Sequence, residues 1–184
     1  MGQELNLTLW NSEVVKMKKS EITELFTNFT VFKWSGWEDI NEEGKLPPSN
    51  VQGLYFVQGE ITKRIKIGIS EKINTRFSGL QTDSPDILTL RMLFLHVSIE
   101  RLGKAEKFLH SLFKEYHSHG EWFNLPEFVM LTLSECKRPE YFYLLTKAKH
   151  TEKGFLEIYE QSIREKDKPD WVIKLQRRNA NKYK

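Results

Sequence analysis

Apolar and polar positions alternate along residues 54–57 and 65–69, which predicts two β-strands. The apolar residues of one parity are Leu54, Phe56, Ile65, Ile67 and Ile69. Side chains alternate across a strand, so we expect this parity to face the core. The connection over residues 58–64 contains Gly59 and is short enough to make the two strands antiparallel neighbours.

The opposite parity of this hairpin carries Tyr55 and Lys66. If the strands pair symmetrically about the connection, Tyr55 is expected opposite Lys66 and Gly53 opposite Gly68. That face would present a phenol, an amine and two backbone positions without side chains. We interpret it as a floor on which a ligand sits.

The pattern after the hairpin predicts a short helix, a loop and a buried strand. Ser70 is a suitable N-cap for a helix whose apolar residues recur at i, i+4 and i+7. These residues are Ile73, Phe77 and Leu80, and Arg76 lies on the same helix. Residues 81–86 have the composition of a loop, and residues 88–97 predict a third strand.

The strongest helical periodicity covers residues 104–117. Its apolar stripe consists of Ala105, Phe108, Leu109, Leu112, Phe113 and Tyr116. Glu106 and His110 lie four residues apart at the border of this stripe, so both side chains can point into one cleft. Residues 120–124 then end the helix, and Pro126 is a favourable first residue for another.

The two flanks are predicted to be extensions of a central domain at residues 51–125. In the N-terminal arm, residues 1–50, Ser20 could cap a helix, and a short strand is expected around residues 29–34. Residues 41–50 have the turn chemistry of a linker. The C-terminal extension, residues 126–184, predicts helices over 126–136, 140–149 and 153–166.

Composition places the chain among globular, intracellular proteins. It has 184 residues, of which 39 % are hydrophobic and 29 % charged. No apolar run approaches the roughly 20 residues that a membrane helix needs, and no signal peptide is visible. The single cysteine, Cys136, excludes an internal disulfide and a multi-cysteine zinc site. We expect a cytoplasmic location, associated with the nucleoid if the source is bacterial or phage.

The charge pattern adds a candidate nucleic-acid contact. The net charge is only +3, but no acidic residue follows Asp170. The basic tail includes Arg177, Arg178 and Lys182, which could bind a phosphate backbone without sequence preference. A solvated, frayed terminus is the alternative interpretation.

Four side chains together supply the chemistry of phosphodiester hydrolysis. The Tyr55 phenol beside the Lys66 cation could shift towards phenolate and act as a general base on water. The Arg76 guanidinium suits a phosphate and the charge that grows in its transition state. The Glu106 carboxylate is the minimum protein ligand for Mg²⁺, which keeps several waters and binds substrate phosphate. Taken singly, residues of these four kinds more often have a structural or solvated role.

These residues belong to a series of motifs that resembles the GIY-YIG nuclease superfamily, over residues 53–125. The motifs are Gly53-Leu54-Tyr55, Lys66-Ile67-Gly68, Arg76, Leu80-Gln81-Thr82 with Pro85, Ala105-Glu106 with His110 and Phe113, and Gly120-Glu121-Trp122-Phe123. The closer similarity is to the phage and bacterial branch of the superfamily. There the second triplet is often K-I-G, and a G-E-W-F stretch follows the helix that carries the metal ligand.

The resemblance implies an α+β fold with a small antiparallel three-stranded sheet flanked by helices. It also implies a metal-dependent endonuclease that holds one Mg²⁺ or Mn²⁺ at Glu106 and cuts DNA, with RNA not excluded. By similarity, Tyr55 would be the general base or the group that orients the water, Lys66 would replace the second family tyrosine, and Arg76 would stabilise the transition state. Secondary candidates are His110, Asn124 and Glu121, of which Glu121 is the rival metal carboxylate.

Two departures from the family pattern bear on the mechanism. Lys66 replaces a tyrosine and could help to acidify Tyr55. Leu80 stands four residues after Arg76, where many relatives carry histidine or tyrosine, so a second proton acceptor there is in doubt. The alternative function is a module of the same fold that binds nucleic acid or acts in assembly without cutting. The sequence does not indicate an oligomeric state.

Overall fold

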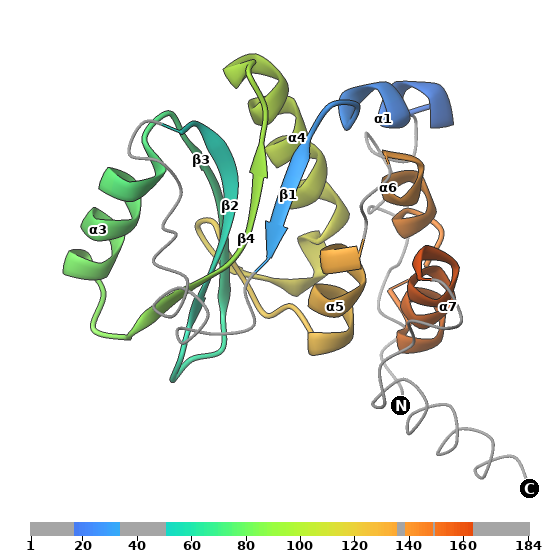
Figure 1. The fold of residues 1–184 in the computed structure, drawn as a ribbon. Helices are drawn as coiled ribbons and strands as arrows, with labels where there is room; N and C mark the ends of the chain where they lie inside the picture. Colours follow the sequence, from blue (N-terminus) through green and yellow to red (C-terminus); the bar gives the residue numbers. More distant parts are fainter. Residues whose placement is uncertain (1–16, 34–50, 136–138, 149, 164–184) are drawn as a thin grey trace, which may run out of the picture.

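The computed structural model describes residues 17–33, 51–135, 139–148 and 150–163. It has an antiparallel sheet with helices on both faces, and thereby confirms the α+β class (Figure 1). The strands are β1 (Thr30–Lys33), β2 (Gly53–Gly59), β3 (Ile65–Ser70), β4 (Leu88–Leu95), β5 (His117–His119) and β6 (Trp122–Phe123). The helices are α1 (Lys19–Leu25), α3 (Ile73–Asp83), α4 (Ile99–Leu112), α5 (Glu127–Glu135), α6 (Pro139–Leu145) and α7 (Glu152–Ser162).

The sheet is larger than the predicted three strands. In the described residues it has six strands in the order β1-β4-β2-β3-β6-β5. Strand β1 pairs with β4, so part of the N-terminal 50 residues forms one edge of the sheet. The hairpin of β5 and β6 extends the other edge by pairing with β3. Strands β5 and β6 are too short to give an alternating pattern in the sequence, which is why the prediction missed them.

The register of the central hairpin differs from the symmetric pairing by two residues. Tyr55 pairs with Gly68, and Lys66 pairs with Val57. Gly53 pairs with Ser70 instead of Gly68. A shift of two residues keeps every side chain on its predicted face, because the period of a strand is two.

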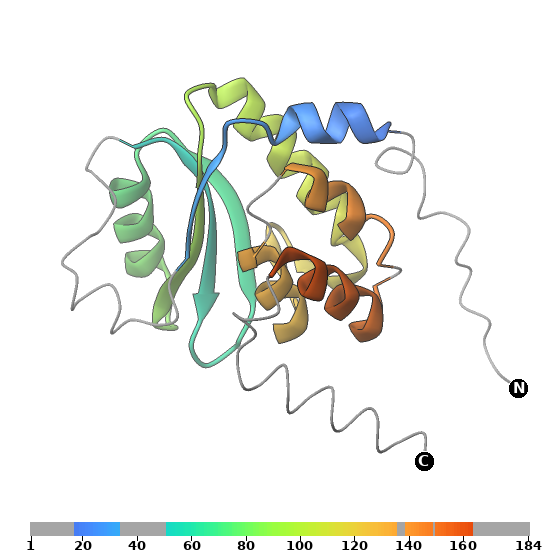
Figure 2. The same ribbon diagram turned by 45° about the vertical axis from the view of Figure 1, so that its right-hand side comes forward.

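The two faces of the sheet pack against different helices (Figure 2). The predicted core parity is confirmed, since Leu54, Phe56, Ile65 and Ile67 are buried in the main hydrophobic cluster with residues of α1 and α4–α7. The other face is not an open floor. Tyr55 and Val57 are buried there in a second cluster with Ile73 of α3 and with residues of β4.

The boundaries of α3 and α4 differ from the predicted ones. The N-cap of α3 is Lys72, and the Ser70 hydroxyl instead accepts the backbone N–H of Lys72. Helix α3 continues to Asp83, through residues predicted as loop. Helix α4 begins earlier than expected because the Ser98 side chain accepts the backbone N–H of Arg101 as an N-cap.

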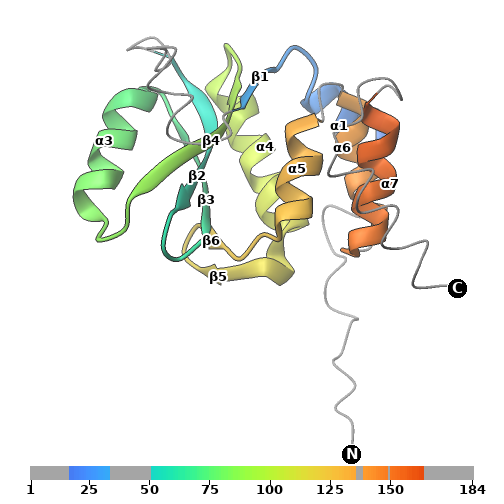
Figure 3. The ribbon, with the colours of Figure 1, turned by 60° about the horizontal axis from the view of Figure 1, so that its bottom comes forward.

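The remaining helices lie on the main-core side of the sheet (Figures 1 and 3). Helices α5, α6 and α7 follow the three predicted C-terminal helices with shorter bounds. Helix α1 is capped at Lys18, whose backbone N–H donates to the Glu21 carboxylate, so Ser20 is inside the helix and is not its cap. No helix in the described ranges combines the length and apolar character needed to cross a bilayer.

Asp86 ties the turn between β2 and β3 to the start of β4. Its carboxylate accepts the backbone N–H groups of Ile61 and Thr62 at 2.9 and 3.0 Å, and the Thr62 hydroxyl at 2.9 Å. The backbone N–H groups of Thr62 and Ile61 hold the pKa of Asp86 below its ordinary value. A contact from outside the hairpin therefore helps to set its turn, which local pattern cannot reveal.

We expect Asp86→Asn to lower the melting temperature at neutral pH, by roughly 2–6 °C, because an amide has one oxygen for three donors. The folded pKa of Asp86 is lowered, so its stabilisation is present above the unfolded pKa and is lost as the pH falls through the folded pKa. The difference from wild type should therefore shrink below about pH 4. Thermal unfolding at several pH values measures this, with Asp83→Asn, at the exposed end of α3, as control.

Candidate functional site

Tyr55 is the buried centre of the predicted site. It lies on β2, is 2 % exposed, and belongs to the hydrophobic cluster beneath α3. The Nε–H of Arg76, on α3, donates to the Tyr55 hydroxyl oxygen at 3.3 Å. Arg76 is otherwise exposed. The structure thus brings together the phenol and the guanidinium that the sequence placed 21 residues apart.

Gly68 provides the space that the Tyr55 ring occupies. It pairs with Tyr55 across the hairpin, and a Cβ added to Gly68 would lie 2.5 Å from the Tyr55 hydroxyl oxygen. The same Cβ would lie 2.7 Å from the ring carbon that bears the hydroxyl. Any larger residue would displace the phenol, so the glycine of the Lys66-Ile67-Gly68 triplet has a steric role.

We expect Gly68→Ala to lower the free energy of unfolding by about 1–3 kcal/mol, since the buried Tyr55 ring cannot move without disturbing its cluster. Gly79→Ala is the matched control, because a Cβ there meets no atom within 4 Å and alanine favours the helix interior. Denaturant unfolding should therefore give opposite signs for the two variants. A Gly68→Ala protein as stable as wild type would contradict the placement of the Tyr55 ring.

Lys66 is paired with Glu121, at the turn between β5 and β6. The Lys66 Nζ atom lies 2.5 Å from a Glu121 carboxylate oxygen, and Lys66 is 8 % exposed. The same Nζ lies 5.8 Å from the ring centroid of Trp122. Glu121 is thus a direct partner of a predicted catalytic residue, and the sequence had ranked it as a secondary candidate.

Only the first two residues of β3 pair with β6. Two side chains of helix α4 form hydrogen bonds with the backbone of the residues that follow on β3. The His110 Nε2 atom lies 3.0 Å from the Ile67 carbonyl oxygen, which makes this nitrogen the donor. The Glu106 carboxylate accepts a hydrogen bond from the backbone of Ile69. Glu106 and His110 are the two border residues of the predicted stripe, and both reach the same strand edge. His110 therefore has a structural hydrogen-bond partner there.

Burial raises the pKa of Glu106 above its ordinary value, and the charge of Glu121 raises it further. His110, the Ile69 backbone and Lys66 oppose this shift. Burial also raises the pKa of Tyr55; contact with Arg76 lowers it, and the charges of Glu121 and Glu106 raise it. The two carboxylates therefore act electrostatically on the same phenol.

The expectation that Lys66 acidifies Tyr55 is wrong for this structure. The pKa of Tyr55 is raised, mainly by burial, and the cation that opposes the shift is Arg76. Lys66 pairs with Val57 in the hairpin register, and its ammonium group is directed to Glu121. At neutral pH Tyr55 is a phenol, which is a hydrogen-bond donor as well as an acceptor.

The donor set suits a weakly coordinated divalent cation. No group of three His, Cys, Asp or Glu side chains in the described residues could form a metal cage. Mg²⁺ does not require one, since it commonly binds one or two carboxylates and completes its shell with water and phosphate. Glu106 is half-buried, and Glu121 carries a second negative charge close enough to raise its pKa. A cation held by Glu106 would relieve this repulsion.

Of the other predicted residues, the structure describes Asn124, and the basic residues of the tail lie outside the described residues. Asn124 follows β6 and is exposed, and its backbone N–H donates to the Tyr116 carbonyl oxygen at 2.7 Å. Arg177, Arg178 and Lys182 lie outside the described residues, as does Cys136. Sequence reasoning missed the steric role of Gly68 and the contact of Lys66 with Trp122. The triplet and the G-E-W-F stretch were the available signals for both.

Residues 52–139 match the model of the T5orf172 domain. This family is associated with nuclease-like domains, so the match supports a nucleic-acid-related function for this part of the chain. Neither the comparison with curated proteins nor that with solved structures gave a match. The matched stretch contains the whole cluster of Tyr55, Lys66, Arg76, Glu106 and Glu121.

Proposed function

We propose that this protein is a metal-dependent endonuclease that hydrolyses phosphodiester bonds of DNA, and that its domain is of the GIY-YIG type. The observation that carries the proposal is the cluster around Tyr55. It joins a phenol, a guanidinium and two carboxylates from β2, α3, α4 and the β5–β6 turn. The similarity to the T5orf172 domain independently supports a nucleic-acid substrate.

A substrate phosphate fits beside Arg76. The guanidinium is exposed, and only its Nε–H is used by Tyr55, which leaves its terminal nitrogens to face a phosphate. Contact with the Tyr55 hydroxyl also raises the pKa of Arg76, which keeps it cationic at any working pH. Arg76 would therefore stabilise the charge that develops on the phosphoryl oxygens.

Tyr55 would orient the attacking water. Its oxygen accepts from Arg76, so its own proton can be donated to a water or a phosphate oxygen. Burial is the main cause of the raised pKa of Tyr55, and the charges of Glu121 and Glu106 add to it. Neutralising the two carboxylates would remove only the smaller part, so Tyr55 would act as a phenol that orients the water.

Glu106 is the proposed ligand of Mg²⁺ or Mn²⁺, with Glu121 as the rival. Bound there, the ion would supply a water of lowered pKa and a positive contact for the scissile phosphate. Glu121 is already paired with Lys66, whereas Glu106 has a backbone hydrogen bond and no ion pair with any side chain in the described part of the chain. Lys66 would then hold Glu121 away from the phosphate.

As the pH is lowered, cleavage should be lost before the pH reaches 4.5, the ordinary pKa of a glutamate. The reason is that the pKa of Glu106 is raised and its anion is needed for cleavage. Replacing Glu121 by glutamine removes a charge that raises this pKa and leaves Lys66, which lowers it. The acid limb of the pH–rate profile should therefore move to lower pH in Glu121→Gln. If the acid limb does not move, the charge of Glu121 does not act on the Glu106 carboxylate as proposed. If Glu121→Gln abolishes cleavage completely, Glu121 is the metal ligand.

The direct test is cleavage of supercoiled plasmid and of labelled single-stranded DNA, with Mg²⁺ or with EDTA. A matched RNA strand tests substrate class. Cutting that requires the divalent ion supports the endonuclease. No cutting of any substrate, with DNA still bound, would favour the non-cleaving binding module. A truncation before residue 164 tests the proposed DNA contact of Arg177, Arg178 and Lys182, and should weaken binding and its salt dependence.

A further inference from the structure

Three side chains lie at one level across the last three strands of the sheet. Lys66 on β3 pairs with Trp122 on β6, and Trp122 pairs with His119 on β5. The His119 ring stacks on the Trp122 ring, with centroids 6.5 Å apart and planes inclined by 21°. Because β6 lies between β3 and β5, Trp122 lies between Lys66 and His119. We call these three residues the edge row.

A bulge in β5 gives His119 its position on this face. The register shifts between His117 and His119, so that His117 pairs with Phe123 and His119 with Trp122. The His117 ring correspondingly contacts the Phe123 ring, on the main-core face. Without the bulge, the i, i+2 spacing would place both histidines on one face. The irregularity therefore directs a single histidine to the side of Trp122.

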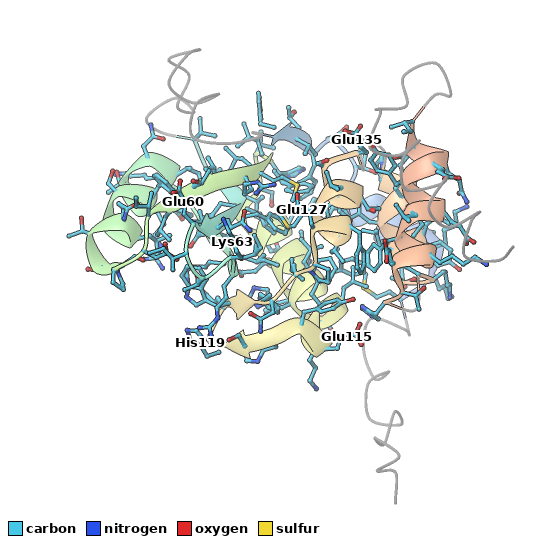
Figure 4. The ribbon with its side chains drawn as sticks, turned by 90° about the horizontal axis from the view of Figure 1, so that it is seen from below. Glu60, Lys63, Glu115, His119, Glu127 and Glu135 are labelled. Carbon is cyan, nitrogen blue, oxygen red and sulfur yellow. The ribbon has the colours of Figure 1, made fainter. Side chains whose placement is uncertain are left out.

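The edge row continues the proposed site towards solvent. Lys66 shares its face with Tyr55, and Glu121, its partner, acts on Tyr55 and Arg76. Helix α3 packs over β2 and β4 on this face, whereas His119 is exposed on β5, the outermost strand of the sheet (Figure 4). Exposure thus increases along the row, from buried Lys66 through half-buried Trp122 to exposed His119.

We propose that the edge row binds an unpaired nucleotide next to the scissile phosphate, with its base stacked on the outer face of the His119 ring, which Trp122 supports from the other side. This inference rests on the proposed nucleic-acid function, and it specifies the substrate as single-stranded or locally unpaired DNA. Aromatic rings bind bases through their faces, and those faces are covered by neighbouring bases in a duplex. The Lys66 ammonium group lies over the inner face of the Trp122 ring. Arg76 interacts electrostatically with Glu121, the partner of Lys66, and would bind the phosphate next to the stacked base.

The test is the binding of a short labelled oligothymidine strand in EDTA, so that cleavage is not needed. A second strand of equal length and charge carries abasic sites in place of bases. We expect His119→Ala to weaken binding of the first strand roughly five- to tenfold and to leave binding of the abasic strand nearly unchanged. His119→Phe should restore base-dependent binding, because a phenyl ring also stacks.

Controls separate stacking from loss of structure. His117→Ala removes a histidine from the same strand but from the other face, and should leave the base-dependent term unchanged. Trp122→Leu keeps apolar volume over the second cluster and should reduce discrimination between the strands. The inference is overturned if wild type binds neither strand, if it binds both equally, or if His119→Ala weakens both alike. Cleavage together with base-independent binding would support the endonuclease and overturn the base-stacking inference. Base-dependent binding without cleavage would support the base-stacking inference and contradict the endonuclease.

Discussion

Glu106→Gln is expected to reduce the rate of Mg²⁺-dependent cleavage by a factor on the order of 10³ and to make the metal-free protein more stable. The loss in rate follows from losing the anion that anchors the cation, whose contact with the phosphate is worth several kcal/mol. The gain in stability follows from the raised pKa, since the folded state disfavours the charged carboxylate. A glutamine oxygen can still accept the hydrogen bond from the Ile69 backbone.

The sign of the stability change is specific to this residue. A folded pKa above the unfolded value means that ionised Glu106 costs stability at every pH above the unfolded pKa, and glutamine removes that cost. Glu100 on the same helix is the matched control, because its contact with Lys104, at 2.6 Å, lowers its pKa. Glu100→Gln should therefore change stability slightly in the opposite direction and leave cleavage intact.

Two measurements check this prediction. Plasmid cleavage with Mg²⁺ gives the rate, and thermal unfolding with and without Mg²⁺ reports binding of the ion, which should raise the melting temperature of wild type only. Cleavage that survives in Glu106→Gln would move the metal to Glu121. A variant less stable than wild type in EDTA would mean that the Glu106 carboxylate has a structural role.

Tyr55→Phe is expected to reduce cleavage by roughly 10²–10⁴-fold with little change in the free energy of unfolding. The ring stays in its cluster beneath α3, and only the hydroxyl is removed. Arg76 loses one acceptor, but it is exposed and can donate to water instead. A large loss in rate at constant stability would distinguish a catalytic hydroxyl from a packing tyrosine.

Tyr116→Phe is the matched control for that change. The Tyr116 hydroxyl donates to the His150 carbonyl oxygen at 3.2 Å, at the junction with the C-terminal helices. Its loss should lower stability by about 0.5–1.5 kcal/mol without affecting cleavage. If Tyr55→Phe instead cleaves at the wild-type rate, the water is oriented by another group, and the role proposed for Tyr55 is wrong.

The motif residues could be located in the sequence, but their partners could not. The order of the triplets, Arg76 and the Glu106 helix is visible in one dimension. The pairing of Lys66 with Glu121 joins residues 55 positions apart, and the reach of Glu106 to Ile69 depends on how α4 crosses the edge of β3. The sequence therefore predicted which titratable groups lie close together, and it misassigned the cation that touches Tyr55.

The sequence by itself determined which face of the hairpin strands is buried and where the helix with the clearest apolar stripe lies. The parity of β2 and β3 and the stripe of α4 follow from periods of two and 3.6 residues, which depend only on local backbone geometry. Tertiary structure decided the hairpin register, the place of the predicted strand β1 in the sheet, the strands β5 and β6, and the opposite faces of His117 and His119. These features depend on contacts between segments that are distant in the sequence, such as the contact of Asp86 with the β2–β3 turn. The alternation of apolar and polar residues cannot fix the register, because a shift of two residues leaves every side chain on the same face.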